Sequence, residues 1–151
     1  MQVHQQSSAD AASVWAVMTD LDRFAGAAAV DHIERLDDGD EFGLGTRWRE
    51  TRTMFGRQAS EEMVVTDFHP GRQYTTQAHN HGMKYESVVS VAETESGCRI
   101  TMSFSAEGGS LVARLFAASI GRLFEPATRR MMAADLAAIA AAAEDDDPDV
   151  G

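Results

Sequence analysis

The sequence is poor in lysine, cysteine and proline, and two of these shortages exclude classes of protein. Lys84 is the only lysine among thirteen basic residues, and 24 acidic residues give a formal net charge of −11. Nucleic acids and anionic membrane surfaces attract clustered positive charge, so the overall balance argues against both as partners. Cys98 is the single cysteine, which rules out an intramolecular disulfide and a cysteine metal cluster.

Long apolar runs are also missing. No stretch reaches the roughly 20 apolar residues of a membrane-spanning helix. The N-terminal MQVHQQSSAD has neither the basic nor the apolar region of a secretory signal. We therefore expect a cytoplasmic protein without stable membrane insertion, with one domain over residues 1–144 and an acidic, disordered tail over 145–151.

Alternation of apolar and polar residues dominates the middle of the chain. The strands expected from this pattern and from the intervening turns are 2–6, 30–36, 46–54, 58–68, 73–79, 83–92 and 98–106. Ser8 is the predicted N-cap of a helix that ends near Met18, and a short helical turn follows at 20–24. Six consecutive strands joined by short turns form an antiparallel meander that buries one face. The predicted fold class is therefore α+β.

The helix-forming stretch Ser110–Glu144 is the only element long enough to cover such a sheet. Its first half carries bulky apolar residues and its second half is mostly alanine, and the two apolar stripes lie on nearly opposite sides of a straight helix. Pro126 cannot donate a backbone hydrogen bond, so we predict a kink between Gly121 and Ala127. A continuous helix with an alanine face against the sheet is the alternative. The bulky first half is expected to form the wall of a pocket.

Several segments of the chain resemble a known family. They are SADAASVWAVMTDLDRF, GLGTRWRE, FHPGRQYTT and ESGCRITMSF, followed by a long C-terminal helix that closes with DLAAIAAAAE. Together they resemble the START-like helix-grip (SRPBCC) superfamily, the birch-allergen-like fold, and within it the polyketide cyclase/dehydrase-like proteins. The resemblance implies a curved sheet of about seven strands around the long helix, two short helices after the first strand, and an internal cavity for hydrophobic small molecules. Small residues at 25–30 depart from the aromatic and proline that relatives usually carry there.

Two charged residues are predicted to share the apolar face of strand 46–54. Alternation places these four side chains on one face: Trp48, Glu50, Arg52 and Met54. A charge that faces a cavity must be paired, hydrated or bound to ligand. Glu50 and Arg52 are therefore candidates for catalysis or for orienting a ligand, with a simple ion pair at the wet end of the sheet as the alternative. His32, as a titratable partner, and Tyr85, as a hydroxyl donor, are predicted nearby.

The remaining predicted cavity residues are apolar and come from the inner faces of the expected elements. They are Trp15, Met18, Trp48, Met54, Val89, Ile100, Met102, Phe104, Leu111, Leu115, Phe116 and Leu123. His79 and His81 flank a turn with no third ligand at recognisable spacing, so we expect no metal site, and no motif implies a cofactor.

Three functions are compatible with these features. The leading one is binding of a hydrophobic small molecule, such as a lipid, polyketide or aromatic compound, by a carrier or sensor. The second is a cofactor-free cyclase or dehydratase that uses acid–base residues in the same cavity. The third is a protein-interaction module, including a homodimer, that uses the first half of the long helix.

Overall fold

The structure, a computed structural model, describes residues 1–54, 56–80 and 82–146, except for the side chains of residues 54, 113, 116, 117 and 119–121. Strand β1 (Gln2–Ser7) is followed by two short helices, α1 (Ala11–Met18) and α2 (Leu21–Ala27). The other elements are β2 (His32–Arg35), β3 (Arg47–Met54), β4 (Arg57–His69), β5 (Gln73–Asn80), β6 (Met83–Thr94), β7 (Gly97–Gly108) and α3 (Leu111–Asp145).

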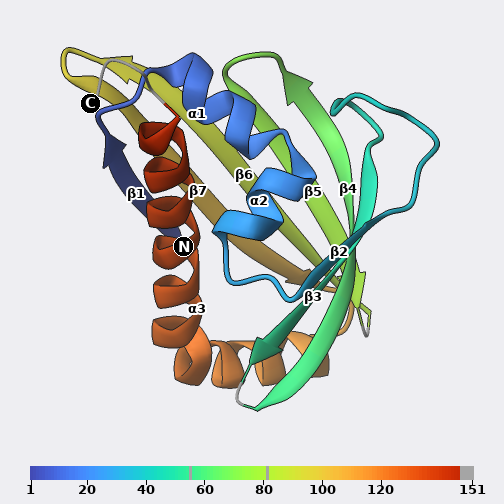
Figure 1. Cartoon of the computed structure of the whole chain (residues 1–151). Helices are drawn as coiled ribbons and strands as arrows, with labels where there is room; N and C mark the ends of the chain where they lie inside the picture. Colours follow the sequence, from blue (N-terminus) through green and yellow to red (C-terminus); the bar gives the residue numbers. More distant parts are fainter. Residues whose placement is uncertain (55, 81, 147–151) are drawn as a thin grey trace.

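The seven strands form one antiparallel sheet in the order β1-β7-β6-β5-β4-β3-β2. The three helices lie on its concave side (Figure 1). The predicted α+β helix-grip architecture is therefore confirmed. Gly97 has φ 144°, and a Cβ added there would lie 2.0 Å from the carbonyl oxygen of Ser7, so only glycine lets the β6–β7 turn pass so close to the end of β1.

Helix α3 bends sharply partway along its length. In Figure 1 its orange N-terminal part runs beneath the sheet, and its red C-terminal part rises along β1 and β7. The element stays helical through Pro126, so the predicted kink is present as a bend without a break. Among the described side chains of α3, the core residues all come from the C-terminal part; they are Met132, Leu136, Ile139, Ala140 and Ala143.

Two local predictions are corrected at the ends of the chain. Asp10, not Ser8, caps α1, because its carboxylate accepts a hydrogen bond from the Ser13 amide at 2.7 Å. The Ser8 amide instead donates to the Glu144 carboxylate at 3.0 Å, which ties the C-terminal end of α3 to the end of β1. The prediction of disorder from residue 145 is corrected for two residues, since Asp145 ends α3 and Asp146 forms an ion pair with Arg23. Residues 147–151 lie outside the described part of the chain.

Candidate ligand site

The inner face of the central strands is buried at one end and open at the other. On the inner face of β6, Val91 and Val89 are buried. The inner-face residues nearer the other end of the strand, Ser87, Tyr85 and Met83, are half-buried. Along β7 the same change runs from fully buried Cys98 and Ile100 to half-buried Met102 and Phe104. The buried end lies under α1 and the C-terminal part of α3, whereas the N-terminal part of α3 runs beneath the open end of the sheet (Figure 1). The open end is therefore the part of this face that a ligand can reach.

The buried end is closed by aromatic side chains. Trp15, Phe42, Phe68 and Tyr74 pack with ring centroids 4.9 to 6.1 Å apart. The Tyr74 hydroxyl donates to the Met18 carbonyl at 3.2 Å, and burial raises the pKa of this phenol, with the negative charge of Glu50 acting in the same direction. Tyr74 is thus a neutral hydrogen-bond donor with a fixed partner. These side chains therefore contribute to packing at the buried end.

The open end offers an aromatic surface and a pocket. The rings of Tyr85 and Phe104 stack with centroids 6.0 Å apart and planes 16° from parallel. Beyond them lies a pocket of about 550 Å³, lined by Met83, Ala106, Glu107, Gly108, Arg114 and Ala118. That volume falls within the range of small-molecule sites. The sequence analysis expects an internal cavity, whereas the described residues form an open surface and a pocket at this end of the sheet.

A buried ion-pair cluster connects β3 to α3. The Arg52 guanidinium donates to the Glu50 carboxylate at 2.9 Å and to both oxygens of Asp135, at 3.1 and 2.9 Å. The Trp48 indole donates to the second oxygen of Glu50 at 3.2 Å. The side chains of Arg52, Glu50 and Asp135 are only 12%, 16% and 5% exposed. Every partner of Arg52 is a carboxylate, so this cluster holds the helix against the sheet and leaves little capacity for an anionic ligand.

Asp135 is a site residue that the sequence-based list omits. A signal for it exists in the sequence, because Met132, Asp135, Leu136 and Ile139 follow the i, i+3, i+4, i+7 pattern of one helix face. An aspartate within an apolar stripe requires a cationic partner when buried. Arg52, on the inner face of β3, is the cation that satisfies it.

Glu61 is a second residue missing from that list. It lies opposite Glu50 on the neighbouring strand. Its pKa is raised, first by burial and then by the charge of Glu50, against the smaller effects of a hydrogen bond from Asn80 and the charge of Arg52. Alternation within β4 places Glu61 on the same face as Met63 and Val65. The inner face therefore carries one carboxyl group that holds its proton more tightly than a solvated glutamate.

We expect Glu61→Gln to stabilise the protein near neutral pH. A carboxyl group whose pKa is raised by folding contributes to stability at pH values below its ordinary pKa of 4.5. This contribution is lost as the pH rises through the raised pKa. Removing the charge should therefore raise the free energy of unfolding by roughly half a kcal/mol, because solvent partly screens the site. Urea unfolding measures this gain, which should vanish below pH 4.5. Glu62→Gln is the control, because Glu62 is exposed and pairs with Arg49 at 2.7 Å; an equal gain there would contradict the prediction.

Two predicted polar residues are not beside the cluster. His32 pairs in register with Thr51, whereas Glu50 pairs with Ile33, so His32 is exposed on the outer face of the sheet. The prediction for His32 is wrong because it placed this residue on the inner face of its strand, whereas the register with β3 puts it on the outer face. Tyr85 lies on the inner face, but β4 and β5 separate its strand from β3, a spacing of about 14 Å along the sheet.

The predicted apolar lining divides into three groups. Met18, Trp48, Val89 and Ile100 are core residues, while Trp15, Met102 and Phe104 are half-buried against the core. Leu111, Leu115 and Leu123 are 72%, 63% and 75% exposed, which corrects their assignment to the cavity wall. They are exposed because the bend carries the first half of α3 away from the concave face. The side chains of Met54 and Phe116 lie outside the described residues.

No group of three or more His, Cys, Asp or Glu side chains able to hold a metal ion occurs within the described ranges. His81 belongs to the undescribed part of the chain, and His79 is exposed. None of the helices that the structure describes is both long and apolar enough to cross a membrane.

Comparison with known proteins adds the following. The family described as polyketide cyclase / dehydrase and lipid transport matches residues 1–144, and curated protein sequences give no match. The protein TTHA0849 from Thermus thermophilus is 13% identical with a TM-score of 0.77, over 95% of each chain. The di-domain ARO/CYC protein StfQ from the steffimycin biosynthetic pathway is 9% identical with a TM-score of 0.78, over 96% of this chain and 50% of StfQ. Ara h 8.0201 is 12% identical with a TM-score of 0.64, over 97% of each chain. At such identities the similar structures establish the fold.

Proposed function

Because this chain belongs to the polyketide cyclase / dehydrase and lipid transport family, we propose that it binds a hydrophobic small molecule as a carrier or sensor. One observation carries the proposal. The inner face of the sheet is half-buried and largely apolar at its open end, where Tyr85 and Phe104 stack beside Met102 and Ser87. Apolar surface of this kind gains free energy when a ligand removes it from water.

The charges around this surface favour an uncharged ligand. Arg52 is surrounded by Glu50 and Asp135, and Glu61 adds a further carboxyl group on the same face. At this cluster an anionic head group would meet net negative charge and find no unpaired cation, and in the pocket at the open end the positive charge of Arg114 is accompanied by the negative charge of Glu107. The Tyr85 hydroxyl and the Ser87 hydroxyl can instead exchange hydrogen bonds with a carbonyl or hydroxyl group. A neutral lipid, polyketide or aromatic compound therefore fits best.

We expect Ser87→Trp to weaken binding of a neutral apolar fluorescent probe by about tenfold or more, because the indole fills the proposed ligand surface. Ser87 lies on the inner face, opposite Phe104 on β7. Ser105→Trp is the matched control, since Ser105 neighbours Phe104 on the same strand but is exposed on the outer face. Fluorescence titration measures both affinities, and circular dichroism confirms that both variants fold.

Equal affinities in the two variants would show that the probe binds elsewhere and would reject the inner face as the site. Native mass spectrometry with solvent extraction of the purified protein then identifies the compound itself. The proposal expects a neutral, largely apolar molecule that the Ser87→Trp variant no longer retains and the Ser105→Trp variant does.

A cyclase or dehydratase is the second candidate, and Glu61 is the observation that favours it. A carboxyl group with a raised pKa beside an apolar surface can act as a general acid or base. Turnover of a bound polyketide that is lost in Glu61→Gln, with binding retained, would establish this candidate. Binding without turnover in both proteins supports the carrier or sensor.

A further inference from the structure

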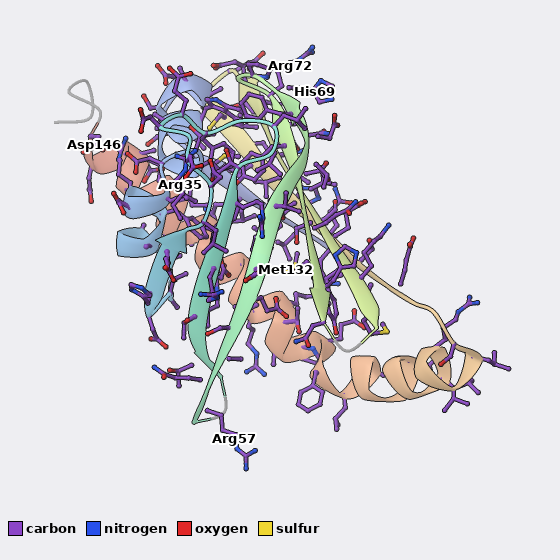
Figure 2. All side chains as sticks on the ribbon, turned by 90° about the vertical axis from the view of Figure 1, so that its right-hand side faces the viewer. Arg35, Arg57, His69, Arg72, Met132 and Asp146 are labelled. Carbon is purple, nitrogen blue, oxygen red and sulfur yellow. The ribbon has the colours of Figure 1, made fainter. Side chains whose placement is uncertain are left out.

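The first part of α3, residues 111–124, exposes an unusual amount of apolar surface; we refer to this segment as the arm. Of the six large apolar residues that are exposed among the described side chains, five lie on it. They are Leu111, Val112, Leu115, Leu123 and Phe124, with exposed fractions of 72%, 77%, 63%, 75% and 41%. The arm projects beyond the sheet, away from the end that carries Arg72 (Figure 2). Apolar residues gathered in this way on one helix mark an interaction surface.

The arm could not bury all of these residues by folding back onto its own sheet. At about 100° per residue, Met132, Leu136 and Ile139 define the side of α3 that faces the sheet. Arg114 and Ala118 fall on this same side, and they already line the pocket at the sheet edge. Val112 and Leu123 lie on the opposite side, so a straightened α3 would still leave them in water. Val112 and Leu123 therefore stay exposed unless a partner outside this chain covers them.

The charge of the arm indicates the chemistry of that partner. The arm contains Arg114 and Arg122 and no acidic residue, in a chain with 24 acidic and 13 basic residues. Both side chains belong to exposed residues, and within the described residues neither guanidinium has a carboxylate at ion-pair distance. Pairing two arms from two copies of the chain would bring like charges together. An anionic lipid surface accepts the arginines at its head groups and the apolar side chains below them.

We propose that the arm is a peripheral docking helix for an anionic phospholipid bilayer. The overall charge of −11 opposes such contact, and Glu107 and Glu125 lie next to the arm. The arm itself carries only its two arginines, and electrostatic attraction to lipid acts within a Debye length of the surface. The arm spans about 20 Å at 1.5 Å per residue, which suits a helix lying in the interface plane rather than crossing the membrane.

Docking would bring the open end of the site to the membrane surface. Arg114 and Ala118 of the arm line the pocket together with Met83 of β6 and Gly108 of β7. A hydrophobic ligand could then pass between bilayer and pocket with little exposure to water. This use of the arm rests on the proposed function, whereas docking itself requires no ligand.

Vesicle flotation of the full chain without added ligand tests the proposal. We expect binding to phosphatidylcholine vesicles containing about one third phosphatidylglycerol, little binding to pure phosphatidylcholine, and weaker binding at high salt. Leu123→Glu should reduce partitioning by about tenfold or more. Leu44→Glu is the matched control, because Leu44 is 72% exposed in the loop between β2 and β3. Arg122→Glu should also weaken binding, whereas Arg72→Glu, at the far end of the molecule, should not (Figure 2).

Three results would overturn the proposal. The first is a wild-type protein that does not float with anionic vesicles, and the second is an equal loss in the Leu44 and Leu123 variants. The third is a dimer in sedimentation analysis that Leu123→Glu dissociates, since a second copy would then cover the arm. Failure of docking is distinguishable from failure of ligand binding, because Ser87→Trp should float like the wild type and Leu123→Glu should bind the soluble probe like the wild type.

Discussion

Arg52→Met is expected to lower the free energy of unfolding by about 3 kcal/mol, because it leaves buried carboxylates without their cation. Asp135 is 5% exposed and receives two hydrogen bonds from Arg52, while Glu50 is 16% exposed and receives one. Without the guanidinium, these two negative charges face each other across the interface of β3 and α3. For a chain of this length the midpoint of thermal unfolding should fall by roughly 6 to 12 °C.

The same strand offers a matched control in Arg49→Met. Arg49 also pairs with two carboxylates, Glu34 at 3.3 Å and Glu62 at 2.7 Å, but its side chain is 43% exposed on the outer face. Exposed pairs contribute about 0 to 1 kcal/mol each, so this variant should lose little stability. Combining Arg52→Met with Asp135→Leu should recover part of the loss, because the uncompensated charge is removed with its partner. Similar losses in the Arg49 and Arg52 variants would refute a special role for the buried cluster.

Leu136→Ala is expected to cost about 3 kcal/mol, through the lost transfer free energy and the cavity that remains. Leu136 is 0% exposed and sits in the main core cluster with Met132 and Ile139. Leu123→Ala, in the same helix, should change stability by less than about 0.5 kcal/mol, because Leu123 is 75% exposed and alanine favours the helix.

Urea unfolding of the two leucine variants measures this difference directly. The difference between their free energies of unfolding shows which half of α3 contributes more to stability. A large cost for Leu123→Ala would mean that the arm packs against the protein in solution. That result would contradict both the exposed arm and the docking proposal built on it.

The sequence by itself was sufficient for the fold class and the order of elements. Period-two alternation between two helical regions predicts an antiparallel meander, and the sheet has that order and pairing. Alternation also predicts correctly that Glu50 and Arg52 share the inner face of β3, because the pleat fixes the side on which alternate residues lie. Pro126 predicts the bend of α3 for an equally local reason, the missing backbone donor.

Which partners these side chains contact, and whether they are buried, was decided only by the tertiary structure. Asp135 and Arg52 are 83 positions apart in the chain, and no local pattern specifies that a helix and a strand so distant will place them together. The face of His32 depends on the register between β2 and β3, and a shift of one residue would reverse it. The bend likewise decides whether Leu111, Leu115 and Leu123 line a cavity or face water. Their apolar character is local, but their surroundings depend on the direction in which α3 leaves the sheet.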